Sequence, residues 1–236
     1  MTISKTNNAR EPNFKGIYRY ANEMLVLSSA IDTIPFKVKE LVKEQADIAF
    51  CTFEKAKSKY HQDIRQFGSD SAVLIELQGA YIIFYNQDEM SCRVRFSILH
   101  EFGHYVLGHE LNITRENPLY GVQEVEANCF AAQLLMPEQL LRVCLNRGKT
   151  LSDDFIMKSF DVSREAAQKR RSTLARTNYE WRSREESRYD DIILKKFADM
   201  FNSIAPLPRQ CAYTFEDDYV REQERNSWLD TRSRWN

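Results

Sequence analysis

The chain has 236 residues and a formal net charge of −1; 43% of its residues are hydrophobic and 28% are charged. This composition is typical of a folded globular protein and excludes wholesale disorder. The balanced charge excludes a globally basic surface of the kind that binds nucleic acid or an anionic membrane. No stretch approaches the roughly 18 apolar residues that a membrane helix needs. The polar segment 1–13 lacks the apolar core of a secretory signal.

The cysteine pattern favours a cytoplasmic protein. The number of cysteines is odd, and no two of them form a CxxC pair. A disulfide framework is therefore not expected. We expect each cysteine to behave as a small buried apolar residue. The cysteines are Cys51, Cys92, Cys129, Cys144 and Cys211.

The first part of the chain predicts two helices followed by a short sheet. Pro35 suits the first turn of the second helix. Gln78-Gly79 stands between two runs of β-branched and aromatic residues, which predicts a hairpin. The expected elements are helices over 14–29 and 36–45, a strand over 47–53, and hairpin strands over 71–77 and 80–85.

The second part of the chain predicts mainly helices. Pro118 and Gly121 indicate a loop, and Pro137 is suited to open a helix. The expected helices cover 96–111 and 123–136, two short segments within 151–173, and an amphipathic segment over 189–204. With the preceding sheet, this order predicts an α+β fold.

Three of the four histidines lie between residues 100 and 109, and two of them form an HExxH motif, His100–His104. On a helix, residues four apart share one face, so both imidazoles can bind one zinc ion. Glu101 lies one step around the helix, where a carboxylate can act as general base and take a proton from water. The motif therefore predicts the active site of a zinc peptidase.

The third ligand is expected on the following helix. His109 points about 140° away from His104 on a continuous helix, so we interpret it as a structural or supporting residue. Glu126 shares an apolar stripe with Phe130 and Leu134, where a carboxylate needs a cation or a metal. Glu124 is instead expected to be solvated.

The sequence leaves three points about the site open. A buried Glu126 could pair with an arginine such as Arg93 or Arg95 in place of a metal. The oxyanion formed during peptide hydrolysis needs a donor, and Tyr105, Tyr120 and His109 are the candidates. The strand over 80–85 could pair with an extended substrate or could be an ordinary core strand.

Two motifs together carry a resemblance to a known family. The first is Arg95–His104, followed by Gly108-His109, and the second is Glu126-Ala127-Asn128, which leads into Phe130–Pro137. Over roughly residues 35–175 the chain resembles the ImmA/IrrE family of metallo-endopeptidases.

The resemblance implies a gluzincin-like fold, in which a small twisted sheet packs on helices around the HExxH helix. It implies His100, His104 and Glu126 as zinc ligands and Glu101 as the catalytic base. It also implies a protein substrate, because members often cleave a helix-turn-helix repressor in phages, mobile elements or stress responses.

Three parts are expected along the chain: a polar tail (1–13), a zinc peptidase domain (14–180) and a helical extension (181–236). Within the domain, residues 151–175 resemble a DNA-binding helix-turn-helix, with Ser163 as the cap of its second helix. The segment suggests an alternative function, a regulator that keeps a zinc site but binds DNA or a repressor. A toxin-like partner in a two-gene module is a further alternative that rests on family habits alone.

Overall fold

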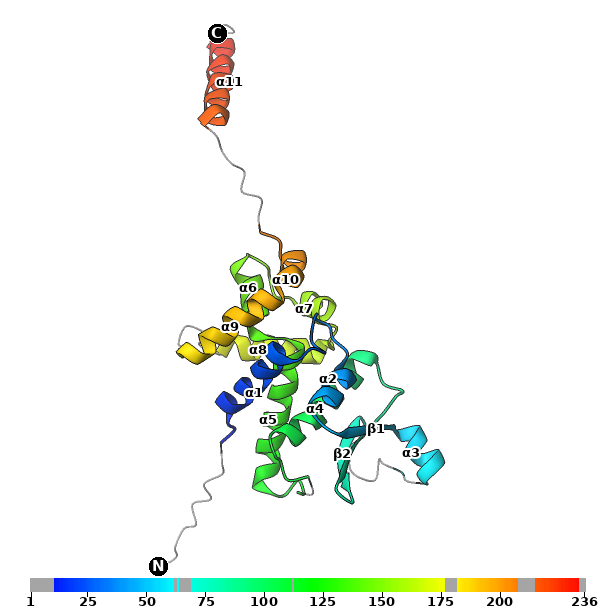
Figure 1. Ribbon diagram of the computed structural model, residues 1–236. Coiled ribbons are helices and arrows are strands. Elements are labelled where there is room, and N and C mark those ends of the chain that lie inside the picture. The colour runs from blue at the N-terminus through cyan, green and yellow to red at the C-terminus, as the bar shows by residue number, and fades with distance from the viewer. Residues whose placement is uncertain are drawn as a thin grey trace, which may run out of the picture. The chain divides into compact units, whose positions relative to one another are not determined.

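The computed structural model describes residues 11–61, 63, 69–111, 113–176, 182–207 and 215–233 (Figure 1). Two units divide the chain, Met1–Pro206 and Leu207–Asn236, and the second contains helix α11 (Phe215–Ser233). None of the helices in these ranges combines the length and apolarity needed to cross a bilayer.

One mixed sheet is formed by the strands of the described ranges: β1 (Ile48–Thr52), β2 (Ala72–Leu77) and β3 (Ala80–Tyr85). The predicted hairpin is confirmed, because β2 and β3 are antiparallel and Gln78 and Gly79 both have positive φ. β1 pairs in parallel with the other side of β3. The central strand is therefore β3, and β2 lies at an edge.

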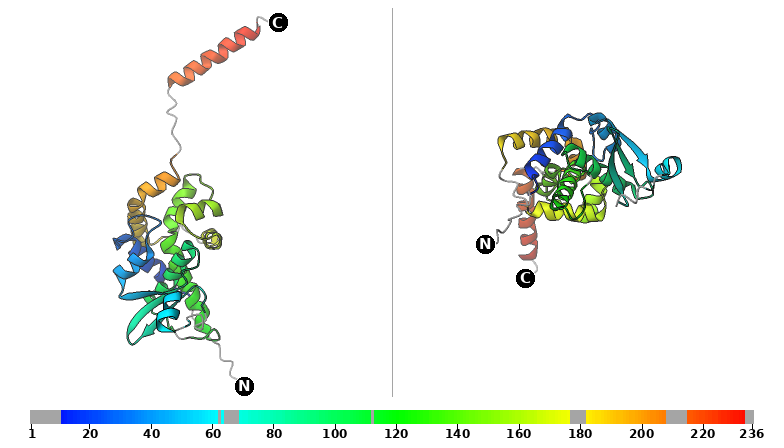
Figure 2. Two further views of the ribbon diagram at one scale, coloured as in Figure 1. Left: turned by 90° about the vertical axis from the view of Figure 1, so that its right-hand side faces the viewer. Right: turned by 90° about the horizontal axis from the view of Figure 1, so that it is seen from below.

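The two faces of the sheet meet different helices. Ile83 and Leu74 belong to the main core, where helix α4 (Ser91–Val106) packs against β2 and β3. Phe84 belongs to a smaller cluster with Phe53 and Ala56 of helix α3 (Phe53–Tyr60). Figure 2 shows α3 on the far side of the sheet from the other helices. The predicted α+β fold is confirmed.

The remaining helices of the first unit complete the main core. Their bounds are Phe14–Leu27 (α1), Val38–Gln45 (α2), Pro118–Leu135 (α5), Glu138–Asn146 (α6), Asp153–Phe160 (α7), Arg164–Arg176 (α8), Arg184–Lys196 (α9) and Ala198–Ile204 (α10). α1 packs along α5 and α9, α4 packs against α5, and α10 packs against α6.

Several helix boundaries differ from the predicted ones for local reasons. α4 starts five residues earlier than expected and ends at Val106, and Gly108 follows with a φ of +65° that continues no helix. α5 begins inside the expected loop, because the side chain of Asn117 accepts from the N–H of Leu119 and Pro118 occupies the first turn. α3 was not predicted, although Thr52 caps it.

The first unit extends to the end of α10, whereas the sequence predicts a boundary near residue 180. Ile193 of α9 and Phe201 of α10 are buried in the main core. Asp190 of α9 accepts from the Gln139 side chain of α6 at 2.7 Å. These contacts make residues 182–206 part of the first unit.

The four cysteines within the described ranges are free thiols. Cys51 and Cys144 are buried, whereas Cys92 and Cys129 are half-buried. The expectation of burial therefore holds in full for two of them, and Cys211 lies outside the described residues.

The helix-turn-helix-like segment forms α7 and α8, and acidic neighbours pair with its basic side chains. Arg164 contacts Asp154 at 2.7 Å, and Lys169 contacts Glu165 at 2.7 Å. Arg170 is buried and donates to a backbone oxygen of the core. These pairs reduce the positive charge that α8 offers to a phosphate backbone.

The turn between α7 and α8 is joined to the HExxH helix by Arg95. Its Nη1 donates to the backbone oxygen and to a carboxylate oxygen of Asp161, both at 2.8 Å. The Arg95 side chain is only 14% exposed. Charge-assisted hydrogen bonds in a half-buried site hold α4 against this turn.

We predict that Arg95→Ala lowers the free energy of unfolding by about 2 kcal/mol, since hydrogen bonds to charged groups contribute about 1.5–3 kcal/mol each. Urea denaturation followed by circular dichroism measures the change. The matched control is Arg93→Ala on the same helix, whose side chain is 58% exposed and pairs with Glu89. Arg93→Ala should change stability by less than about 0.5 kcal/mol. Equal effects of the two substitutions would contradict the role given to Arg95.

Candidate metal centre

Helix α4 presents its two motif histidines side by side. His100 and His104 lie one turn apart, and their Nε2 atoms are 3.1 Å from each other. Both side chains are largely buried. The predicted convergence of the two imidazoles is present in the structure.

Helix α5 brings Glu124 to the same point. Its carboxylate oxygens lie 3.4 Å from His100 Nε2 and 3.5 Å from His104 Nε2. The three ligand atoms lie within 4.8 Å of one another. Two ligands bound tetrahedrally to zinc at about 2.0–2.1 Å would stand about 3.3–3.4 Å apart. Two imidazoles and one carboxylate at these spacings fit a zinc ion.

Charge complementarity binds these three side chains to one another. Burial lowers the pKa of His100, but the hydrogen bond with Glu124 and the nearby Glu101 carboxylate outweigh burial and raise the pKa overall. Burial raises the pKa of Glu124, but its hydrogen bonds to His100 and His104 outweigh burial and hold the pKa well below its usual range. Glu124 is therefore an anion at neutral pH, as a metal ligand must be.

Glu126, the predicted third ligand, is paired with His109 in the structure. Its Oε2 lies 3.0 Å from His109 Nε2, and its Oε1 accepts from the backbone N–H of Asn13. Two residues along a helix correspond to a rotation of about 200° around its axis, so the two side chains lie on nearly opposite sides. Since Glu124 faces the motif histidines, Glu126 faces elsewhere. The arginine alternative does not hold for Glu126 either, because a histidine is its partner.

Asn128 is a site residue that the sequence analysis missed. Its Nδ2 donates to the backbone oxygen of Glu124 at 2.7 Å, so its Oδ1 faces His100 Nδ1 at 3.2 Å. His100 then donates from Nδ1 and keeps Nε2 available for a metal. The available signal was an asparagine inside a helix, where it is an unfavourable residue, one turn after Glu124.

Glu101 lies between the histidines and the sheet. Its Oε2 accepts from the backbone N–H of Leu74 in β2 at 2.8 Å. Burial raises its pKa, although the nearby histidines act in the opposite direction. A carboxylate that is held in place and made more basic suits the general-base role predicted for Glu101.

A comparison with protein-family models shows the family of the chain. The model of the IrrE N-terminal-like domain, peptidase family M78, matches residues 43–172, more than half of the chain. The chain belongs to the ImmA/IrrE family of metallopeptidases. No curated protein matches it. The matched range includes the motif histidines, Glu101, Glu124 and Asn128.

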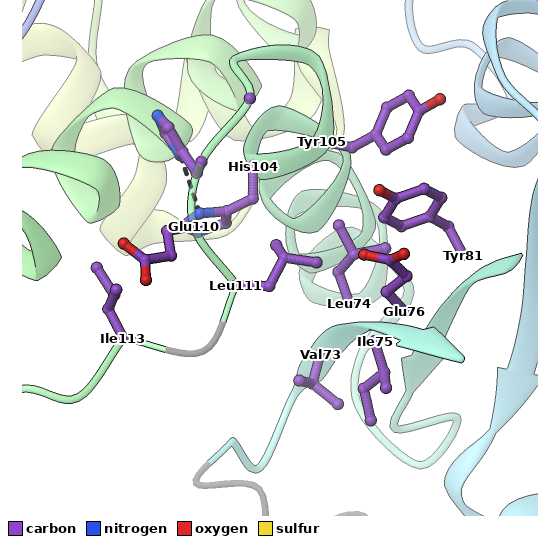
Figure 3. A pocket seen from close by; sticks show the side chains of 12 residues that line it. Val73, Leu74, Ile75, Glu76, Tyr81, His104, Tyr105, Glu110, Leu111 and Ile113 are labelled. Carbon is purple, nitrogen blue, oxygen red and sulfur yellow. Dashed lines mark hydrogen bonds between the residues drawn. The ribbon is translucent and has the colours of Figure 1, made fainter. Parts of the chain in front are cut away.

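In this ImmA/IrrE metallopeptidase, a cavity of about 620 Å³ lies beside His104 of the candidate metal centre. One wall is strand β2 from Val73 to Glu76, and the other is the end of α4 with the loop that follows it. Figure 3 shows His104, Tyr105 and Tyr81 around the cavity, with Glu76 beside Tyr81. The neighbouring carboxylate of Glu76 raises the pKa of Tyr81.

The three oxyanion candidates occupy different positions in this family member. Both ring nitrogens of His109 are engaged, one with His104 and one with Glu126, which leaves the imidazole no N–H to offer an oxyanion. Tyr105 lines the cavity beside His104, and its ring packs edge-on against Tyr81. Tyr120 stands one helical turn before Glu124. Tyr105 is therefore the candidate best placed beside the cavity.

We predict that the purified protein, supplied with zinc, holds one zinc ion per chain, and that Glu124→Ala and His104→Ala lose most of it because each removes one of three ligands. Mass spectrometry of the metal content measures this. The matched control is Glu116→Ala, an exposed carboxylate just before α5, which should retain the zinc. Full zinc content in Glu124→Ala would exclude this residue as a ligand.

Proposed function

We propose that the chain is a zinc-dependent endopeptidase that cuts a cytosolic helix-turn-helix repressor, or a similar regulator, at a specific site. The observation that carries this proposal is the convergence of His100, His104 and Glu124 next to the carboxylate of Glu101, with His104 lining a cavity. Membership of the ImmA/IrrE family supports the peptidase activity. The repressor substrate rests on the family resemblance.

The side chains have separate tasks in this proposal. Zinc bound by the two histidines and Glu124 would lower the pKa of water to about 7 and polarise the scissile carbonyl. Glu101 takes the proton from the attacking water and passes it to the nitrogen of the leaving amine. The Leu74 N–H holds Oε2 of Glu101, so Oε1 handles the proton. Tyr105 is the residue assigned to the oxyanion.

The edge of β2 is the surface assigned to the substrate backbone. In an antiparallel pair, alternate residues direct their N–H and C=O groups away from the partner strand. Leu74 belongs to this outward set, because its N–H donates to Glu101, and Glu76 belongs to it by register. An extended peptide can pair with this edge beside the cavity. The strand 80–85 cannot serve, because β3 is paired on both sides.

We predict that Glu101→Gln reduces cleavage at least about 100-fold, the usual range for loss of a general base, while zinc content stays at one ion per chain. Gln keeps an oxygen for the Leu74 N–H but accepts no proton. The assay incubates zinc-loaded protein with a purified helix-turn-helix repressor and follows the product by mass spectrometry. Wild-type rates in Glu101→Gln would contradict the mechanism. DNA or repressor binding by a protein that cleaves nothing would favour the regulator alternative.

We predict that Glu76→Pro lowers kcat/KM for a protein substrate about tenfold, since the loss of one interface hydrogen bond costs about 1–1.5 kcal/mol. Proline is tolerated where an edge N–H faces outward, so the fold should persist. Glu76→Ala removes the same side chain and keeps the N–H. Cleavage kinetics of both variants isolate the backbone group, and equal kcat/KM values would contradict substrate pairing along β2.

A further inference from the structure

A series of hydrogen-bonded polar side chains connects His104 through His109 to Glu126. His104 Nδ1 lies 3.0 Å from His109 Nδ1, and His109 Nε2 lies 3.0 Å from Glu126 Oε2. Glu126 Oε1 accepts from the backbone N–H of Asn13 at 2.7 Å. The side chains of His109 and Glu126 are only 3% and 4% exposed.

The metal site determines which atom donates in each of these hydrogen bonds. Nε2 of His104 must be free of hydrogen to bind a metal, so Nδ1 carries the proton and donates to His109 Nδ1. His109 accepts there, so its own proton lies on Nε2 and is donated to Glu126. One carboxylate then accepts from His109 and from the backbone of Asn13, and every buried donor is satisfied.

We propose that His109 and Glu126 are positioning residues that orient the His104 ring and strengthen it as a metal ligand, with the Asn13 backbone holding the carboxylate in place. The inference rests on the proposed metal site and goes beyond it, because neither residue touches the metal. A carboxylate behind a ligand imidazole fixes its tautomer and raises its basicity. Here a second imidazole transmits that effect.

The two motif histidines are thus supported in different ways. The Nδ1 of His100 meets the neutral amide of Asn128. The Nδ1 of His104 meets an imidazole backed by an anion. Asn13 lies before residue 43, where the match to the family model begins. The N-terminal cap of α1 therefore joins this chain's metal centre to a segment outside the matched domain.

Glu126→Gln is the sharpest substitution for the test. Gln has one acceptor oxygen and one NH2 group, whereas Glu126 accepts on both oxygens. If its oxygen faces His109, its NH2 opposes the Asn13 N–H. If its oxygen faces Asn13, its NH2 opposes the N–H of His109. Either orientation places two donors against each other without changing the side-chain volume.

The experiment measures the zinc dissociation constant by competition with a chromophoric chelator in wild type, Glu126→Gln, His109→Ala and the double variant. Loss of a partner behind a metal ligand weakens zinc binding by about 10–100-fold. We expect each single variant to fall in this range. The double variant should be no weaker than the worse single variant, because both substitutions interrupt one chain. Circular dichroism and urea denaturation of the zinc-free proteins verify that the compared proteins are folded.

A second pair of variants tests the backbone donor by itself. Asn13→Pro removes the N–H and the capping side chain, and the φ of −85° at this residue is close to that of proline. Asn13→Ala removes only the side chain and keeps the N–H. Weaker zinc binding in Asn13→Pro than in Asn13→Ala supports the proposal. This comparison remains valid even if Glu126→Gln or His109→Ala fails to fold. Equal zinc affinities of the two variants would contradict the role given to the Asn13 N–H.

The contradictory outcomes are distinct. Unchanged zinc affinity in Glu126→Gln and His109→Ala would overturn the proposal and leave the metal site intact. Zinc loss as complete as in Glu124→Ala would make Glu126 a ligand and also overturn it. Multiplied losses in the double variant would show that the two residues act independently. Failure of wild type to bind zinc would overturn the proposed function itself.

Discussion

The close packing of α4 against α5 is the constraint on which the metal centre depends. A Cβ atom at Gly103 would lie 3.1 Å from the Phe130 ring and 3.3 Å from Cα of Ala127, so only glycine leaves α5 this close without displacing it. Ala127 stands three residues after Glu124 and therefore on a neighbouring part of the same face. The small residues at this contact bring the Glu124 carboxylate to the two histidines. The HExxH spacing brings the two histidines together, and the contact between α4 and α5 adds Glu124.

Local rules predicted the features that lie within one element. The i, i+4 spacing of His100 and His104 placed both rings on one face, and Gln78-Gly79 predicted the hairpin from its own backbone requirements. For Glu126, the predicted third ligand, the sequence argument left out one possible partner. A carboxylate in an apolar stripe needs a buried partner, and His109 supplies one without a metal. Which of two nearby carboxylates meets the histidines depends on how α5 is rotated against α4, and that is a tertiary contact.

The position of His109 shows how one local break redirects a site residue. On a continuous helix, this side chain would point away from His104. α4 instead ends at Val106, and the positive φ of Gly108 turns the chain so that the His109 N–H donates to the backbone oxygen of His104. Both imidazoles then meet through their Nδ1 atoms. The edge position of β2 was equally beyond local rules, because it depends on where β1 docks on β3.

The most direct measurement is a crystal structure of the zinc-loaded protein with anomalous data collected at the zinc edge. The account predicts one anomalous peak bounded by Nε2 of His100, Nε2 of His104 and the Glu124 carboxylate, with Glu126 still paired to His109. A peak bounded by Glu126 or by His109 would contradict the central claim, as would zinc bound away from the HExxH motif.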